Sequence, residues 1–524
     1  MPLSTFEVVT FLLCILGLCS AKSLLRKRRP LPLPPGPKPR LLIGNLKDLL
    51  EFGQPWIHWA KHKDLYGPIS SVTVFGKTLV ILNESSIASD LLEKRSAIFS
   101  NRPRMVFGGE MVGWGDTLTA QQYSDRFRAY RKALHTEIGS KSSVSRFNVL
   151  QEIEVGRFLL HVLREPETIF QRVRTMAGAI ILKISHGYAI NHRDRDSLVD
   201  LAEEVLEIFS RTAVAGTWIV DMLPFLRYIP AWVPGMTFKR TVTKWRKSIT
   251  DLTEVPYAFV KRQMDLGIHT PSYTSSRLDK GIRTPEDEFI VKWTAQSIYA
   301  GGADTTVATL QCFFLAILIY PEVQHKAQEE IDAVIGNDRL PNFDDRQDLP
   351  YIDAIVKEVL RWHPIAPLAF PHVSTEDDVF QGYFIPKGAW LIPNIWLFTH
   401  DSKTYHDPMV FKPERFLGDE PEMDPHNLSF GFGRRICPGR EFADASVYLT
   451  IAQTLAVFDI NKAVENGNVL EPKVEFTPGT ISHPVDFKAD IKPRNEKAEA
   501  LIRSVEEEHP FTTGDAEVLK SLKI

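Results

Sequence analysis

The sequence predicts one large, mainly α-helical domain with small β-sheets, preceded by an N-terminal membrane anchor. Three observations support this prediction. Helical periodicity recurs along most of the chain, residues 41–495 contain neither an internal repeat nor a low-complexity linker, and residues 8–21 are apolar and uncharged. A length of 524 residues alone would suit two to four domains. The lack of a dividing linker therefore favours a single domain over residues 41–495.

Composition excludes two classes of protein. The formal net charge of −3 argues against general nucleic-acid binding. Only four cysteines are present, too few for a disulfide framework. Cys14, Cys19 and Cys312 lie in apolar sequence and are best interpreted as small hydrophobic residues. Cys437 differs because its neighbours are polar and rich in glycine.

Residues 1–25 predict a transmembrane anchor. The uncharged run from Val8 to Ala21 is shorter than the roughly 20 residues that span a bilayer, but counting through Leu25 with Lys22 extended toward the interface gives enough length. A cleaved signal peptide is the alternative, because residues 19–21 resemble a cleavage site. No Lys or Arg precedes the run and several follow it, so we expect a retained anchor with a cytosolic body.

The segments at the two ends of the body have distinct compositions. Residues 26–40 are basic and proline-rich, with six prolines between Pro30 and Pro39. Proline favours extended polyproline II structure, so this linker is expected to be a stiff spacer, and an SH3-type ligand is the weaker interpretation beside an anchor. Residues 496–524 are charged and lack strong apolar periodicity, which predicts a C-terminal tail.

Within the body, elements follow from periodicity and from proline. Residues 69–83 alternate around Gly76 and predict a β-hairpin. Helical patterns cover residues 85–99, 151–165 and 198–213. The longest predicted helix runs from about Glu286 to Tyr320, and another begins at Pro321. The chain after Pro393 is rich in loops until a further helix over residues 440–458.

The stretch from Phe430 to Gly439, FGFGRRICPG, is the strongest candidate site. Glycines at 431, 433 and 439 allow a tight loop and the close approach of a flat ligand. We expect Cys437 just before a helix with Pro438 at its first position, where the helix dipole and nearby arginines favour a thiolate. A lone thiolate makes a poor zinc site. Alone, however, the stretch suits a buried cysteine in a turn equally well.

Three further motifs are uninformative when each stands alone. Glu358 and Arg361 are spaced as an ordinary i,i+3 ion pair on a helix. Residues 411–416, FKPERF, read as a charged loop. Residues 300–306, AGGADTT, place two glycines within the longest helix at a cost of roughly 1 kcal/mol each. Such a weak point allows a kink, with Asp304 and Thr305 turned toward a cavity.

Together and in this order, the motifs closely resemble those of the cytochrome P-450 superfamily of haem-thiolate monooxygenases, especially its membrane-anchored fungal members. The resemblance covers about residues 30–490. The haem-loop pattern F-x-x-G-x-R-x-C-x-G is filled by Phe430, Gly433, Arg435, Cys437 and Gly439. The resemblance implies a fold that holds haem b, with the Cys437 thiolate as the axial ligand of the iron.

Other residues of this chain match further motifs of the family. Glu358 and Arg361 fill E-x-x-R, and Arg415 is the arginine of P-E-R-F, which together imply a charge network beneath the haem loop. Residues 301–306 fill [AG]-G-x-[DE]-T-T. The resemblance implies that Asp304 and Thr305, within this motif, deliver protons during oxygen activation.

The resemblance also implies which side chains meet the haem propionates. These are Arg131, His372 and Arg435, with Arg128 a weaker candidate. The family's usual W-x-x-x-R reads Phe127-x-x-x-Arg131 here, so the tryptophan that often meets a propionate is absent. Phe127 is therefore given only a packing role.

The implied reaction inserts one oxygen atom from O2 into a lipophilic small molecule, by hydroxylation or epoxidation, in secondary or xenobiotic metabolism. No flavin or nicotinamide fingerprint occurs in the chain, so electrons must come from a separate NADPH-dependent cytochrome reductase, with cytochrome b5 as an additional candidate donor. The basic residues Arg128, Lys132, Arg434 and Arg440 offer a docking surface. The implied location is the endoplasmic reticulum membrane, single-pass, with the catalytic domain on the cytosolic face.

Two alternatives remain at this stage. A haem-thiolate isomerase or dehydratase is the nearest one, and a non-enzymatic haem sensor belongs to another class. Relatives of the first kind often lose the acid–alcohol pair, and a sensor does not need it. The intact Asp304–Thr305 pair therefore favours a monooxygenase.

Overall fold

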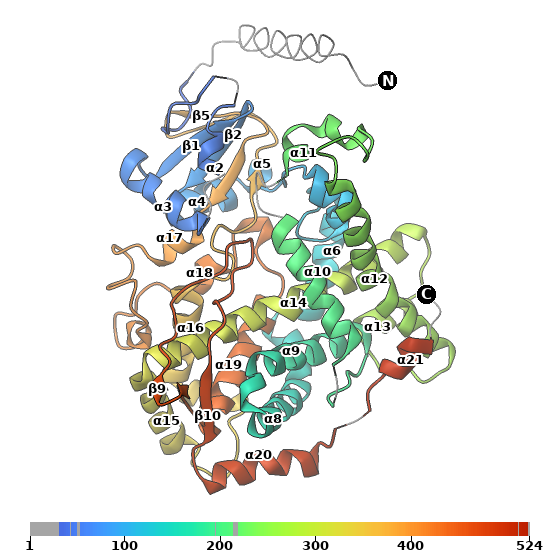
Figure 1. Cartoon of the computed structure of the whole chain (residues 1–524), viewed down its shortest axis with the longest axis vertical. Coiled ribbons are helices and arrows are strands. Elements are labelled where there is room, and N and C mark those ends of the chain that lie inside the picture. Colours follow the sequence, from blue (N-terminus) through green and yellow to red (C-terminus); the bar gives the residue numbers. More distant parts are fainter. Residues whose placement is uncertain are drawn as a thin grey trace.

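The computed structural model describes residues 31–521 apart from 42, 50–52, 194, 213–217 and 512. The predicted anchor at residues 1–25 lies outside the described residues. The described chain forms a helical body with its main sheet at one end, as Figure 1 shows. The longer helices are α3 Pro55–Tyr66, α6 Asp125–Ile138, α8 Asn148–Arg164, α9 Ile169–His186, α10 Ser197–Thr212, α12 Phe238–Asp265, α13 Tyr273–Asp279, α14 Pro285–Ile319, α15 Pro321–Val334, α16 Pro350–Trp362, α19 Arg440–Val457 and α20 Glu496–Glu508.

Short helical segments connect these elements. They include α2 Leu46–Leu49, α4 Ser85–Ser89, η1 Asp90–Lys94, α5 Ser96–Phe99, η2 Val106–Val112, η3 Trp114–Asp116, α7 Lys141–Val144, η4 Ser145–Phe147, η5 Pro166–Thr168, α11 Ile219–Met222, η6 Pro224–Tyr228, η7 Asp344–Asp348, α17 Ile395–Thr399, η8 Pro413–Phe416, α18 His426–Ser429, η9 Gly433–Arg435 and α21 Ala516–Ser521. The helices expected over 151–165, 198–213 and 286–320 are confirmed as α8, α10 and α14. The segment 85–99 is divided instead, because the π-helical turn η1 separates α4 from α5.

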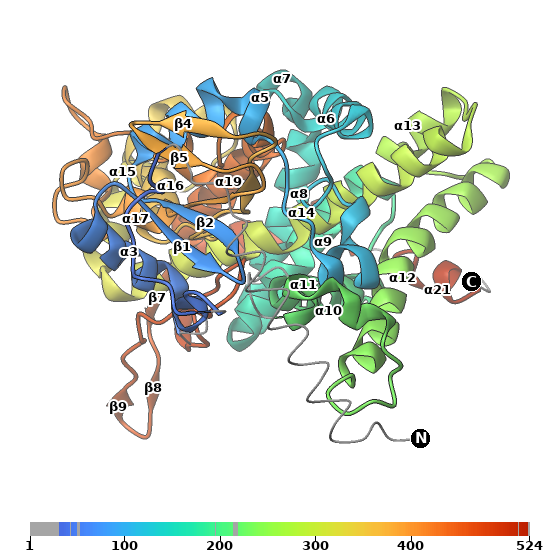
Figure 2. The ribbon, with the colours of Figure 1, turned by 90° about the horizontal axis from the view of Figure 1, so that it is seen from above.

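Helix α14 crosses the body (Figures 1 and 2) and organises its packing. Thr284 caps its first turn by accepting a hydrogen bond from the Asp287 N–H, and Pro285 occupies the first turn, where no N–H is needed. Of the described residues, α14 is the one helix long and apolar enough to cross a membrane. However, 72% of its apolar window is buried inside the protein, so it is a core helix that packs against α9, α10, α12 and α19.

The main sheet has four strands in the order β1-β2-β6-β3. Strands β1 (Ile69–Val74) and β2 (Lys77–Leu82) are antiparallel, which confirms the predicted hairpin around Gly76. Strand β6 (Trp390–Pro393) runs parallel to β2 and antiparallel to β3 (His372–Val373). Figure 2 shows this sheet at the side of the body opposite α12 and α13. Two-stranded sheets pair β4 Asp378–Phe380 with β5 Tyr383–Ile385, β7 Phe458–Lys462 with β10 Ala489–Pro493, and β8 Val464–Glu465 with β9 Asn468–Val469.

The proline-rich linker is docked on the main sheet where the structure describes it. The Ser71 N–H donates to the Pro35 carbonyl at 2.7 Å, and the Ser71 hydroxyl donates to the Pro34 carbonyl at 2.6 Å. A Cβ at Gly36 would lie only 1.8 Å from the Ser71 carbonyl oxygen, so the backbone approaches β1 too closely for any side chain. Residues 34–36 are therefore hydrogen-bonded to β1, whereas composition predicted a stiff spacer in this segment.

The expectation of a loose charged tail is wrong for residues 496–508. This segment forms α20, capped by the Asn495 side chain, which accepts from the Ala498 N–H. Ala498, Ile502 and Val505 are buried, and α20 packs against α8. They recur at intervals of four and three residues, so a narrow apolar stripe was present within the charged sequence.

Candidate active site

The loop from Phe430 to Cys437 is closed by its own backbone. The Cys437 N–H donates to the Phe430 carbonyl at 2.9 Å. Gly433 adopts a φ of +56°, and a Cβ there would lie 2.2 Å from the Leu92 carbonyl oxygen. Only glycine satisfies both the backbone angle and the close approach to η1.

The helix predicted over residues 440–458 is confirmed as α19, but Pro438 is not at its first position. Helix α19 starts at Arg440 with Gly439 as its N-cap residue, so Pro438 lies in the preceding turn rather than at the first helical position. The sequence signal misled because proline is also common in turns. The Gly439 N–H donates to the Cys437 sulfur. Burial raises the pKa of the Cys437 thiol, whereas this hydrogen bond and the charges of Arg131 and Arg440 act to lower it.

Arg435, from the same loop, donates hydrogen bonds to three backbone carbonyls. Its Nε and Nη2 donate to Ser100 and Gln121 carbonyls, each at 2.8 Å, and its Nη1 donates to Leu118 at 3.3 Å. The guanidinium also lies over the Phe127 ring, 3.8 Å from its centroid. Phe127 therefore contacts a cation in addition to the packing role expected for it.

Arg131 and His372 reach the same region from α6 and β3. Arg131 Nη1 donates to the Ile436 carbonyl, next to Cys437, at 2.6 Å. His372 is buried, and its Nδ1–H donates to the Phe99 carbonyl at 2.7 Å. Burial and the charge of Arg102 keep the pKa of His372 well below its ordinary value, so this imidazole is neutral.

Arg102 is a member of this group that the motif analysis missed. It is only 7% exposed, and its Nη1 donates to the carbonyls of residues 370 and 371. Its charge lowers the pKa of both Arg435 and His372, so it is near both. The local sequence does not distinguish Arg102, because Arg104, two residues later, is exposed. Hereafter, Arg102, Arg131 and Arg435 are called the cation cluster, and the neutral His372 lies beside them.

The three arginines of the cation cluster have no carboxylate partner among the residues that the structure describes. Burial lowers the pKa of Arg102 to about 9. Burial, followed by the charges of Arg102 and Arg131, lowers the pKa of Arg435 to about 8. Buried cations without counter-ions are costly unless an anion completes them. A haem that carries two propionates and meets a thiolate at Cys437 fits this set of donors.

A second buried group of charges is complete within the chain. Arg361 on α16 donates from Nε and Nη2 to both oxygens of Glu358, at 2.7 and 2.8 Å. Arg415 Nε donates to Glu358 Oε1 at 3.2 Å, and its Nη1 donates to Glu422 at 2.6 Å. Arg361 and Glu358 are fully buried. The structure thus joins the three residues that the motifs singled out, and it adds Glu422. These four residues are called the Glu358 network.

A third group of charges links α18, just before the loop, to α19. His426 Nδ1 and Nε2 lie 2.6 Å from Asp424 and 2.9 Å from Asp444, and Arg346 donates to Asp444 at 2.6 Å. Burial acts to lower the pKa of His426, but its bonds to the two carboxylates outweigh burial and raise the pKa to about 9. His426 is therefore charged near neutral pH.

The acid–alcohol segment lies within α14, whose helix continues without a break through both glycines. A Cβ at Gly302 would lie 2.7 Å from Ile181 of α9, whereas a Cβ at Gly301 would meet nothing within 4 Å. Gly302 therefore permits helix packing, and Gly301 faces open space. The Thr305 hydroxyl donates to the Gly301 carbonyl at 2.7 Å. The Asp304 carboxylate accepts instead from His483 at 3.2 Å.

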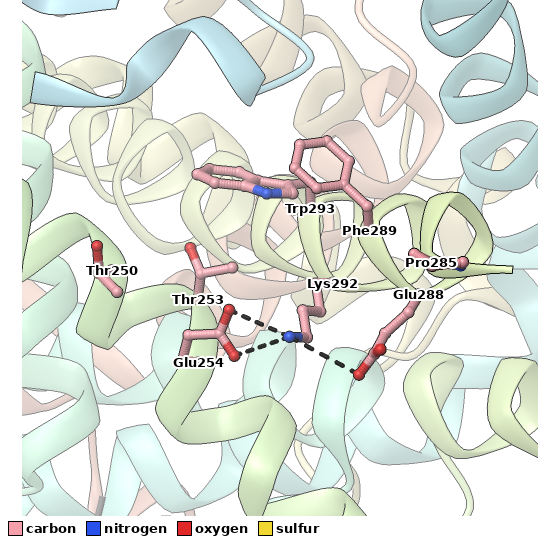
Figure 3. A pocket seen from close by; sticks show the side chains of 8 residues that line it. All are labelled: Thr250, Thr253, Glu254, Pro285, Glu288, Phe289, Lys292 and Trp293. Atoms are coloured by element: carbon pink, nitrogen blue, oxygen red, sulfur yellow. Dashed lines mark hydrogen bonds and ion pairs between the residues drawn. The ribbon is translucent and has the colours of Figure 1, made fainter. Parts of the chain in front are cut away.

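A surface hollow near the start of α14 is separate from these residues (Figure 3). It lies between α12 and α14, where Lys292 pairs with Glu254 at 2.9 Å and with Glu288 at 3.7 Å. Trp293 on its rim precedes Gly301 by eight residues, about 12 Å along the helix. The hollow contains none of the residues that the motifs singled out.

Comparisons with known proteins agree with the site's chemistry. The cytochrome P450 family model matches residues 34–487. Cytochrome P450 monooxygenase claR of Ampulloclitocybe clavipes is 51% identical over 92% of this chain and 90% of its own length. Cytochrome P450 monooxygenase ppsD of Aspergillus oryzae is 44% identical over 99% of both chains. The O-methylsterigmatocystin oxidoreductase of Aspergillus flavus is 41% identical over 96% of both chains.

These matches span nearly the whole body and exceed what a shared fold alone would give. They confirm the resemblance, the fold class, the haem with a cysteine thiolate as its axial ligand, and the use of O2 and a small-molecule substrate. The chain belongs to the cytochrome P450 family and is a haem-thiolate monooxygenase.

Proposed function

We propose that Cys437 supplies the thiolate ligand and that the cation cluster holds the haem propionates. The observation that carries this proposal is a cysteine beside partly buried arginines that lack carboxylate partners within the described chain. When bound, haem supplies the activation of O2 and the oxidation of the substrate. Arg131 and Arg435 would donate to the propionates. His372, whose Nδ1–H is taken by the Phe99 carbonyl, would donate to a propionate from Nε2 only with that nitrogen also protonated. Their present bonds to backbone carbonyls orient the guanidinium groups in advance.

The remaining motif residues have two proposed roles, which are to support the haem loop and to deliver protons. The Glu358 network would hold the chain under the loop, which is tied to α16 by a bond from the Ser429 hydroxyl to the Leu360 carbonyl at 3.0 Å. Thr305, on the open side of α14, would hold a proton at its hydroxyl oxygen and pass it onward. Asp304 would supply that proton from its carboxyl group.

The proposal is tested by the spectrum of the reduced protein with carbon monoxide. The wild type should absorb at the Soret position characteristic of haem-thiolate proteins, and Cys437→Ser should lose this spectrum because a serine hydroxyl does not supply a thiolate. A matched control, Cys312→Ser, alters a buried cysteine on α14 that is far along the helix from Gly301. A thiolate-type spectrum that persists in Cys437→Ser contradicts the ligand assignment.

We infer that electrons come from a separate NADPH-dependent diflavin reductase, with cytochrome b5 as a further donor. Arg128, Lys132, Arg434 and Arg440 are exposed on α6 and around the loop, and Arg128 and Arg434 both lie against the Tyr123 ring. An acidic partner surface would complement them. Rates of reduction that fall with rising ionic strength, and fall further in Lys132→Ala, would support this docking surface; salt-independent reduction would contradict it.

We propose a lipophilic substrate that is hydroxylated or epoxidised in secondary metabolism. The supporting observations are the apolar segments near residues 105–112 and 364–370, and a relative named O-methylsterigmatocystin oxidoreductase. Screening apolar compounds for a ligand-induced shift of the haem spectrum identifies the substrate class. A response confined to charged compounds would contradict this part of the proposal.

We further propose that residues 1–25 anchor the chain in the endoplasmic reticulum membrane, that residues 26–40 link the anchor to the catalytic domain at 41–495, and that this domain faces the cytosol. Two glycosylation sequons test the orientation. Asn83 is only 1% exposed and donates to the Gly67 carbonyl, so it cannot carry a glycan in the folded protein. Asn427 is exposed and should remain bare in the cytosol. A glycan on Asn427 would place the domain in the lumen.

A further inference from the structure

His483 lies beside α14 and contacts it at two points. Its Nε2 lies 3.2 Å from Asp304 Oδ2, and its Nδ1 lies 2.9 Å from Gln311 Oε1. Both partner atoms are acceptors, so the ring donates to both of them in its protonated form, which has an N–H on each nitrogen. Asp304 and Gln311 are seven residues apart on α14, so they lie on the same face about two turns from each other. The imidazole bridges these turns. Within the described part of the chain, His483 is the only side chain that bonds the Asp304 carboxylate.

The backbone around His483 is held by hydrogen bonds that do not involve the imidazole. The His483 N–H donates to the Thr477 hydroxyl at 3.0 Å, and the Thr477 N–H donates to the His483 carbonyl at 2.8 Å. The neighbouring Ser482 N–H donates to the Ile365 carbonyl at 2.8 Å, and the Ser482 hydroxyl lies 2.9 Å from His363 Nε2. The segment 477–483 therefore presents the imidazole to α14, and removing the ring leaves this segment's own bonds intact.

The contact with His483 sets the direction of the Asp304 carboxylate relative to the Thr305 hydroxyl. Successive side chains on a helix point about 100° apart. The Thr305 hydroxyl is bound to the Gly301 carbonyl on the open side of α14, whereas the Asp304 carboxylate is held toward His483. Both members of the Asp304–His483 pair are about one-fifth exposed, so water reaches them. The acid is therefore held by a partner outside α14.

We propose that His483 is the positioning residue for Asp304: with Gln311 fixing the ring, it holds the carboxylate where it takes protons from solvent for Thr305. This inference rests on the proton-delivery role given to Asp304 and Thr305 under the proposed function. His483 touches neither haem nor substrate in this proposal and acts only through Asp304.

The test needs no identified substrate. The holoenzyme is supplied with NADPH, a diflavin reductase and O2, and the hydrogen peroxide released per NADPH oxidised is measured for each variant. A second readout is the C–O stretching frequency of carbon monoxide bound to the reduced protein, which reports on nearby dipoles. Asp304→Asn and Thr305→Ala establish whether the pair delivers protons.

His483→Leu should raise the peroxide fraction severalfold, by the same factor as Asp304→Asn, and the double variant should show no further increase. Both single variants should change the C–O stretch in the same direction. His483→Gln, whose amide N–H can still donate to Asp304, should restore most of the wild-type behaviour. Gln311→Leu should have a smaller effect of the same sign.

Three outcomes overturn the inference, and they are distinguishable. If Thr305→Ala and Asp304→Asn leave the peroxide fraction unchanged, the proposed proton delivery fails and the role of His483 fails with it. If those two variants act but His483→Leu does not, only the role of His483 is lost. If His483→Leu and His483→Gln lower the unfolding temperature alike while the C–O stretch stays at its wild-type value, the residue merely fastens the 477–483 segment.

Discussion

The Glu358 network is buried and the cation cluster partly buried, and both are built on arginines, but they differ in how the charge is balanced. In the network, Arg361 and Arg415 each bond the Glu358 carboxylate. In the cluster, Arg102 and Arg435 bond backbone carbonyls, which are neutral. The first region is complete as the chain folds. The second leaves positive charge for a group that the chain does not supply.

The pKa values of the arginines differ between the two regions in the same way. Burial acts to lower the pKa of Arg415, but Glu358 and Glu422 outweigh burial and leave that pKa above its ordinary value. For Arg435, burial and the neighbouring cations act together and lower the pKa to about 8. The pKa of Arg415 is therefore raised where carboxylates bond it, and that of Arg435 is lowered where its charged neighbours are cations.

The largest expected effect is the loss of the network's carboxylate. Glu358→Ala leaves Arg361 and Arg415 buried with one partner fewer, which costs about 3–5 kcal/mol of folding free energy. We expect little holoprotein, measured as haem per polypeptide, and a lower urea midpoint for what remains. Glu414→Ala is the matched control, because Glu414 pairs with Lys326 at the surface. Normal haem content and an unchanged midpoint in Glu358→Ala would remove the distinction between the two regions.

The His426 group should show a smaller, pH-dependent effect. Because the pKa of His426 in the folded protein is about 9, above its ordinary value, its stabilisation is full below about pH 6.5 and is lost as the pH rises through 9. The loss amounts to at most about 3 kcal/mol. The free energy of unfolding, measured in urea at pH 6, 7.5 and 9.5, gives this loss. In His426→Gln the free energy of unfolding should depend less on pH over this range. Equal pH dependence in the variant and the wild type would show that other groups cause it.

The contrast between the regions was only partly predictable from sequence. The spacing of Glu358 and Arg361 places them on one helix face, so local geometry brings them together. Glu422 and Arg102 meet their partners only through tertiary packing, because their contacts are made by loops distant in sequence. The sequence therefore did not predict which region has its charge balanced within the chain, because this balance depends on Glu422 and Arg102.

The same limit applies to other elements. The long helix, the hairpin and the haem loop follow from periodicity, proline and glycine, which act locally. The docking of residues 34–36 on β1 and the contact of His483 with Asp304 required the folded chain. Pro438 was wrongly placed at the first position of α19 because proline suits both a turn and a first helical turn.

The measurement that tests the central claim most directly is haem loss from the cation cluster. Arg435→Gln removes the charge but keeps an amide donor for the Ser100 and Gln121 carbonyls, so the fold should persist. Losing a charged hydrogen bond to a propionate costs about 1.5–3 kcal/mol, so transfer of haem to excess apomyoglobin should accelerate about 10- to 100-fold. Arg434→Gln, at the exposed neighbouring position, should match the wild type. If Arg435→Gln loses haem no faster than Arg434→Gln, the buried cations do not hold the haem, and the account given of this site is contradicted.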